Sequence, residues 1–251
     1  MTVSDVIAAL ALPPESRVDQ RVTKKLLVEH GAPTAADKRQ INDGIEELLW
    51  VAALKPITIG VPEYRDTSRE VLEIAVLSLS LRPEAKAGRL IELIHRAIPY
   101  PVFLITEQAN TVTLSLASKR LAQNEADRVV LDESPVTCSL EASSNVRDPL
   151  ASLSLAAQPR LHLLALYNGW IACLEALLAA RITGKLAIAD DAVGQVARRR
   201  ALADHARLQR EIAAIRAQAQ KEKQVNRRVE LNIEIKRLEA EQASSVQSLK
   251  G

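Results

Sequence analysis

Acidic side chains and one lysine fall on or beside the predicted strands, where they could hold a hard cation. These residues are Glu73, Glu107, Asp132, Glu133 and Lys119. Metal-dependent nucleases place two carboxylates and a lysine on a small sheet, where they bind such a cation and activate water. In the usual spacing an acid and a lysine are two residues apart on the second strand, but the segment 115–119 has no acid beside its lysine. A divergent metal-dependent nuclease is therefore one hypothesis, and ordinary exposed strand residues are the simpler alternative.

Other patterns that carry chemistry are missing from the sequence. Neither G-x-x-x-x-G-K nor G-x-G-x-x-G occurs, so we expect no nucleotide binding by these routes. The four histidines lie in different segments, and none has a second His or Cys at metal-ligand spacing. Cys138 and Cys173 are expected to be small buried hydrophobic residues. The sequence predicts no cofactor and favours a non-enzymatic protein without deciding the question.

Basic side chains are concentrated towards the C-terminus. Residues 196–251 hold thirteen Lys or Arg and seven Asp or Glu, a net charge of +6 within a chain whose total is +2. Such a basic segment on a mildly acidic body suggests an acidic partner or nucleic-acid phosphates, and a solvated charged helix is the alternative. The candidate partner or phosphate contacts, including a smaller N-terminal group, are Arg21, Lys24, Lys25, Arg198, Arg199, Arg200, Lys221, Lys223, Asn226, Arg227, Arg228 and Asn232.

The composition restricts the class of protein. The chain has 251 residues, of which 47% are hydrophobic and 25% charged, values typical of globular proteins. Only 2% are aromatic, which argues against modules that bind nucleic acids by base stacking. Two cysteines and an N-terminus without signal-peptide character predict a cytoplasmic location. The apolar stretch Leu161–Ala180 contains polar residues and predicts a buried core helix rather than a membrane span.

Hydrophobic periodicity predicts an α+β fold, with flanking helices on a mainly antiparallel sheet. We expect a helix from Thr34 to about Leu54 and another over Pro83–Ile98. Predicted strands cover Ile57–Gly60, Arg69–Leu81, Tyr100–Thr106, Thr111–Ala117, Val129–Leu131 and Val136–Leu140, with a hairpin turn at Gln108–Asn110.

The C-terminal part is predicted to be helical, with a buried helix from Arg160 to about Ile182 and one long helix from Asp191 to about Ser248. The long helix carries two short heptad-like stripes, which predict coiled-coil character. The stripes begin 23 residues apart, which is not a multiple of seven, so they do not share a register, and the polar segment Gln220–Arg228 separates them. The predicted regions are a globular domain (1–150), a buried helix with a linker (151–190) and the long basic helix (191–251). The stripes are formed by Leu208, Ile212, Ile215 and Ala219, and by Leu231, Ile235 and Leu238.

The C-terminal stretch Lys221–Leu238 resembles the closing helix of the bacterial family DUF4391, a domain of unknown function. In that family a charged E-K-Q-x-N-x-x-V-E-x-N run precedes K-x-L, as it does here. The chain departs from the family in having fewer aromatic residues on its middle strands. Weaker similarities extend the resemblance over about residues 17–240, at Arg21–Leu26, Glu47–Trp50, Leu54–Pro56 and Ala97–Val102.

The resemblance implies an accessory role but names no catalytic residue. Members of the family often accompany DNA methyltransferases and helicase-like ATPases in restriction or phage-defence gene clusters. The resemblance therefore implies a non-enzymatic adaptor of such a complex, with the ATPase or methyltransferase as partner and duplex DNA as a further candidate. A homodimeric coiled-coil scaffold without a nucleic-acid role is the alternative, beside the divergent nuclease.

Overall fold

The computed structural model describes residues 1–122, 129–140, 150–188 and 191–249. The chain forms two compact units, Met1–Leu174 and Glu175–Gly251. Helix α6 (Leu163–Thr183) begins in the first unit and ends in the second.

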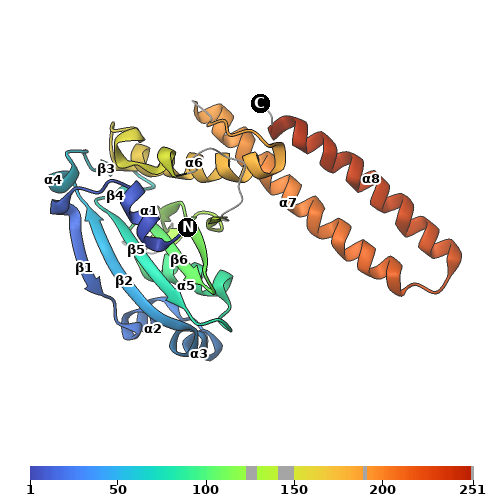
Figure 1. The fold of residues 1–251 in the computed structure, drawn as a ribbon, viewed down its shortest axis with the longest axis horizontal. Coiled ribbons are helices and arrows are strands. Elements are labelled where there is room, and N and C mark those ends of the chain that lie inside the picture. Colours follow the sequence, from blue (N-terminus) through green and yellow to red (C-terminus); the bar gives the residue numbers. More distant parts are fainter. Residues whose placement is uncertain (123–128, 141–149, 189–190, 250–251) are drawn as a thin grey trace. The chain divides into compact units, whose positions relative to one another are not determined.

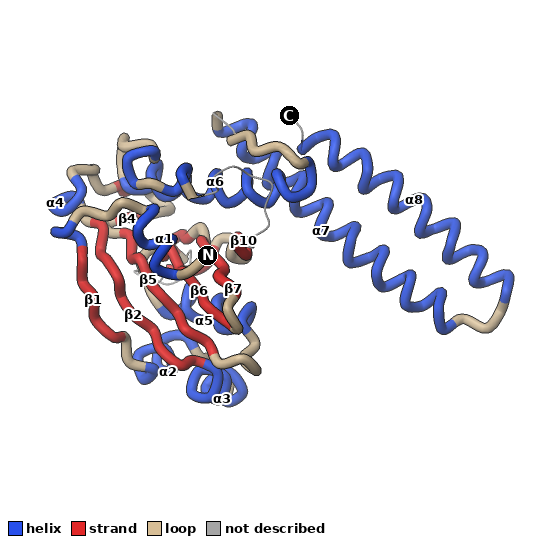
Figure 2. The backbone as a smooth tube through the Cα atoms, in the orientation of Figure 1, coloured by secondary structure: helices blue, strands red, loops and turns tan. Residues whose placement is uncertain are grey.

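The first unit is built on a six-stranded sheet (Figure 2). Neighbouring strands are antiparallel except β5 and β6, which are parallel and are connected through helix α5 (Ala87–Ala97). The mixed α/β fold and the mainly antiparallel sheet confirm the prediction. In spatial order the strands are β1 (Arg17–Arg21), β2 (Ile45–Leu54), β5 (Ile74–Leu81), β6 (Val102–Gln108), β7 (Thr111–Leu116) and β10 (Val136–Leu140).

Helices pack on both faces of this sheet. Helices α2 (Lys24–Gly31), α3 (Ala35–Gly44) and α5 share one hydrophobic core with alternate residues of β5. On the other face, Trp170 of α6 packs edge-on against Phe103 of β6, with 5.1 Å between ring centroids. Helix α1 (Val3–Ala9) also contacts β6. Because both faces are covered, the central strands read as nearly continuous apolar runs.

Two consecutive segments, which include strand β2 and the short helix after it, were predicted wrongly. The expected helix from Thr34 to Leu54 is α3 followed by β2, and the expected strand Ile57–Gly60 is the short helix α4 (Pro56–Ile59). Gly44 ends α3 where the backbone comes close to α5: an added Cβ would lie 2.9 Å from Cδ1 of Leu90. The apolar run that follows is equally compatible with a helix face and with a buried central strand, so periodicity could not separate them.

The hairpin and the shorter strands agree better with the sequence. The turn between β6 and β7 has positive φ angles at Ala109 (48°) and Asn110 (64°), as a tight hairpin turn requires. The predicted strand Arg69–Leu81 is interrupted after Val71: its first residues belong to a separate two-stranded ribbon, and residues 74–81 form β5. Two further ribbons pair β3 (Tyr64–Arg65) with β4 (Glu70–Val71), and β8 (Lys119–Leu121) with β9 (Val129–Leu131).

The second unit is a helical hairpin of α7 (Ala192–Lys221) and α8 (Val225–Leu249). The prediction of one uninterrupted helix was wrong. The helix ends before residues 222–224, which form a turn, and a second helix runs back along the first (Figure 1). The two offset apolar stripes pack against each other, with Leu208 and Ile212 of α7 in one core with Ile235 and Leu238 of α8. In this chain the register shift seen in the sequence therefore falls where one helix ends and the next begins.

The base of the hairpin is held by the last turns of α6. Ala179 of α6, Ala201 of α7 and Leu249 of α8 form a small buried cluster. Helix α6 is long and apolar enough to cross a membrane by length and composition, but 72% of its 18-residue apolar stretch is buried inside the protein. This burial agrees with the predicted core helix.

Candidate functional site

The acids of the nuclease hypothesis lie at different places on the sheet. Glu73 directly precedes β5, and its carboxylate is 3.1 Å from Nζ of Lys55. Glu107 lies near the far end of β6, opposite Ser80 of β5. Because seven residues of strand separate these two levels, the two acids are about 23 Å apart along the strand direction. They do not share one site.

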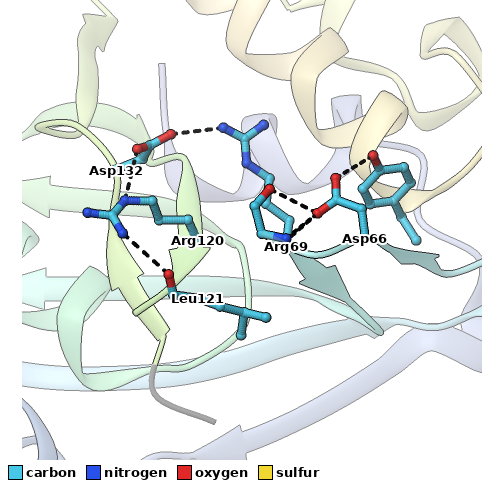
Figure 3. A network of polar contacts seen from close by, with 7 residues as sticks. Asp66, Arg69, Arg120, Leu121 and Asp132 are labelled. Carbon is cyan, nitrogen blue, oxygen red and sulfur yellow. Dashed lines mark hydrogen bonds and ion pairs between the residues drawn. The ribbon is translucent and has the colours of Figure 1, made fainter. Parts of the chain in front are cut away.

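The other members of that set lie in the β8–β9 ribbon. Lys119 pairs with Leu131, and Asp132 and Glu133 follow in the turn. Arg69 and Arg120 each approach one carboxylate oxygen of Asp132, at 2.8 and 3.3 Å (Figure 3). The carboxylate is thus held between two guanidinium groups. Over the described ranges, no group of three or more His, Cys, Asp or Glu side chains could hold a metal ion.

Arg69 links this ion pair to a second polar cluster. Its backbone N–H donates to Oδ1 of Asp66 at 2.7 Å (Figure 3). The Tyr64 hydroxyl donates to Oδ2 of the same carboxylate at 2.7 Å. Leu121 N–H also donates to the carbonyl of Ser68 at 2.7 Å. The network joins the β3–β4 turn to the β8–β9 ribbon, so it fixes the position of Lys119 at the start of that ribbon.

Lys119 is a buried lysine with an unusual set of partners. Its Nζ donates to the carbonyl oxygens of Ile98 and Tyr100, each at 2.5 Å. Burial lowers the pKa of Lys119 to about 7. A neutral amine has two N–H groups, and both are used here. The ammonium form has a third N–H, which has no further acceptor among the described residues.

His95 lies near this lysine on α5 and is also buried. Its Nε2 is 3.0 Å from the Ser115 hydroxyl oxygen, whereas Nδ1 has no hydrogen-bond partner in the described part of the chain. Burial, followed by the charge of Lys119, holds the pKa of His95 well below its usual value. The ring is therefore neutral at pH 7 and has one unused nitrogen.

Lys119 and His95 line a cleft of about 830 Å³ in the first unit. A volume of this size falls in the range of small-molecule sites. The ends of α2 and α5 form two of its walls, and Trp50 of β2 and Tyr100 before β6 add aromatic surface. The sequence placed Lys119 in a hypothetical nuclease site and assigned no role to His95.

The N-terminal basic candidates have partners within their own unit. Arg21 is 3.7 Å from Glu47, and Lys25 is 3.8 Å from Glu29. Lys24 donates to the carbonyl of Asn42 at 2.8 Å. They lie on β1 and α2, apart in sequence from the basic residues of α7 and α8.

The C-terminal basic candidates divide into two groups. Arg198, Arg199 and Arg200 lie near the start of α7, where Arg199 Nε is 2.6 Å from the buried Glu175 carboxylate. Around the hairpin turn, Arg227 Nε is 3.6 Å from Glu222. The remaining exposed candidates at the turn and on α8 are Lys221, Lys223, Asn226, Arg228 and Asn232.

An exposed apolar stripe on α8 was missed by the sequence analysis. Val225, Val229 and Ile233 have exposed fractions of 62%, 51% and 64%. Their spacing of four residues keeps them on one side of the helix. At 100° per residue, this side lies about 150° around α8 from the buried Ile235 and Leu238. The helix therefore packs on α7 with one face and presents apolar side chains on the opposite face.

The fold and these surfaces define a mixed α/β protein with a C-terminal helical hairpin. The family model described as "Domain of unknown function (DUF4391)" matches residues 10–241, so the chain belongs to this family. The comparisons with curated proteins and with solved structures gave no match.

Proposed function

We propose that the chain is a non-enzymatic accessory subunit of a bacterial DNA-acting defence or restriction-like complex, and that its hairpin docks on a protein partner. The observation that carries the adaptor role is the outward apolar stripe of α8. The defence context, with a helicase-like ATPase or DNA methyltransferase as partner, comes from the family resemblance.

The hairpin supports the adaptor role because its own seam is already occupied. Leu208 and Ile212 pack on Ile235 and Leu238 within the same chain, so pairing with a second copy is not needed to bury them. The stripe on the opposite face remains exposed. Burying an apolar side chain of this size contributes about 1.5–3 kcal/mol, which is enough for three such residues to anchor an interface.

The charge at the turn between α7 and α8 indicates which kind of partner surface would complement the hairpin. Lys221, Lys223, Arg227 and Arg228 lie within eight residues that contain one acid, Glu222. An apolar groove with an acidic rim would complement the stripe and these charges. The same cations could also contact DNA phosphates, and such contacts would weaken steeply with salt.

The test is purification of the tagged full chain from its native host, with a photo-crosslinker placed at position 229. A crosslink to a DNA-acting enzyme that is lost in V225D/I233D, and kept in V193D, supports the proposal. V193D is the matched control because Val193 is also exposed on the hairpin but lies near its other end. Nuclease treatment separates a direct protein contact from tethering through DNA.

Light scattering on the purified chain distinguishes the alternatives. A dimer that is abolished by V225D/I233D would favour the homodimeric scaffold. A monomer whose measured mass increases with duplex DNA, but not at high salt or in K221E/K223E/R228E, would indicate that the turn is a phosphate-binding surface. Either result without a protein crosslink would contradict the adaptor role.

A further inference from the structure

We propose that the cleft of the first unit binds a small organic anion with a flat apolar body, and that Lys119 receives its acidic group. This site lies entirely within Met1–Leu174 and does not depend on the proposed role of the hairpin.

The hydrogen-bonding geometry of Lys119 favours an anionic ligand. The carbonyls of Ile98 and Tyr100 take two of its N–H groups, and both residues line the cleft. An anionic oxygen would supply the third acceptor that the ammonium form requires. A buried ammonium without that acceptor is costly, so an anion stabilises the charged form as it binds.

The other charged groups that line the cleft do not oppose an anionic ligand. His30 and Arg96 line the cleft with one acid, Glu29, which is 3.8 Å from Lys25. His95 adds a buried ring whose Nδ1 has no partner among the described residues. Arg96 is itself 2.7 Å from Glu92. The charges of Glu29 and Arg96 are therefore both paired, and Lys119 is the cation of the cleft that can take a further acceptor.

The aromatic residues account for the flat apolar body. Trp50 donates its indole N–H to the carbonyl of Ala52 at 2.9 Å, so this polar group is already used. Trp50 and Tyr100 both line the cleft, although the whole chain has only six aromatic residues. Planar ligands gain from contact with such rings in addition to the area that they bury.

The experiment compares two dyes that differ in one acidic group. The anionic probe is 8-anilinonaphthalene-1-sulfonate, and the neutral probe is N-phenyl-1-naphthylamine, the same body without the sulfonate. Fluorescence titration of the full chain should show the anionic dye binding about tenfold or more tightly than the neutral one, as one charge-assisted contact implies. Equal affinities would overturn the proposal.

Variants assign the site. K119M should remove the preference for the anionic dye, K119R should keep it, and K38M, at an exposed lysine on α3, should change nothing. W50L should weaken both dyes, whereas V225D/I233D should weaken neither. If K119M also fails to bind the neutral dye, its cleft is disrupted and the test passes to the folded K119R variant. Loss of the preference for the anionic dye in K119R then contradicts the proposal. Insensitivity of both dyes to W50L would place them elsewhere and also overturn it.

The pH dependence has a defined direction. Lys119 becomes neutral as the pH rises through about 7, so affinity for the anionic dye should fall from pH 6 to pH 9 and affinity for the neutral dye should not. An unchanged anionic-dye affinity in the wild type would contradict the role of the ammonium. The charged and titratable groups that line the cavities around Lys119 are His95, Arg96, Glu29, His30, Tyr100, Arg69, Glu70, Arg120 and Tyr167.

Discussion

The guanidinium of Arg89 holds both carboxylate oxygens of Asp37, with Nε 2.8 Å from Oδ1 and Nη2 3.0 Å from Oδ2. This pair joins the first turn of α3 to α5. Asp37 also accepts a hydrogen bond from the Thr34 hydroxyl at 2.7 Å. The helix start and the packing of two helices thus depend on one carboxylate.

Asp37→Asn is expected to lower the melting temperature at pH 7 and to make stability less sensitive to acid. The hydrogen bonds from Arg89 and then Thr34 lower the pKa of Asp37 from 3.8 to about 2. A lowered carboxylate pKa stabilises the fold above pH 4, and this contribution is lost as the pH falls towards 2. In thermal melts from pH 7 to pH 2, the melting temperatures of the wild type and of Asp37→Asn should converge as the pH falls. Asp43→Asn, at an exposed position of α3, should not reproduce the difference.

Lys119→Met should remove a rise of stability with pH. The unfolded chain holds the Lys119 proton up to about pH 10.5, whereas the folded chain releases it near 7. Between these values the unfolded state binds more protons, so the free energy of unfolding rises with pH, by up to about 1.4 kcal/mol per unit from this group. Urea unfolding at pH 7, 8 and 9 should give a steeper slope for wild type than for K119M. Equal slopes would show that Lys119 stays charged; K38M serves as the control.

Gly31→Ala should destabilise the first unit by about 1–3 kcal/mol, as overpacking does in a dense core. An added Cβ would lie 2.6 Å from Cβ of Ala97 and 2.9 Å from the carbonyl oxygen of Leu93, where α2 meets α5. Gly88→Ala, on the same helix pair, meets nothing within 4 Å. It should be neutral or stabilise by up to about 1 kcal/mol, because alanine favours helix. Urea unfolding of both variants at pH 7 provides the comparison, and a neutral G31A would argue against the close approach.

Ile235→Asp and Ile233→Asp should behave differently although they are two residues apart on α8. Ile235 is 8% exposed and packs in the hairpin seam, whereas Ile233 is 64% exposed. A charge in the seam should cost several kcal/mol because it would be buried without a partner, and a charge on the outer face should cost little. Helicity and thermal melting check this, and a similar loss in both variants would mean that the outer face is covered.

The sequence was most informative where local chemistry decides the structure. The Ala109–Asn110 turn, β9, β10 and the apolar face of α5 followed from turn residues and periodicity. The segment from Ile45 was misread because its apolar run fits a helix face as well as a central strand, and only the sheet decides between them.

The candidate site was less accessible to sequence reasoning. The Nζ atom of Lys119 donates to the carbonyls of Ile98 and Tyr100, which follow α5 and lie about twenty positions earlier in the chain. No spacing rule connects such residues, so neither the cleft nor the unused nitrogen of His95 could be anticipated. The outer stripe of α8 was present as a four-residue repeat, but only the pairing of α7 with α8 shows which apolar face remains free of the hairpin core.

The hairpin also sets a distance. With a rise of 1.5 Å per residue, the 30 residues of α7 span about 45 Å. The cluster of Ala179, Ala201 and Leu249 anchors one end, and the turn at residues 222–224 lies at the other. Shortening α7 and α8 together by two heptads would bring the turn about 21 Å closer to the anchor while keeping the faces aligned. The number of residues in the pair therefore sets how far the turn lies from the anchored end, independently of the side chains on its surface.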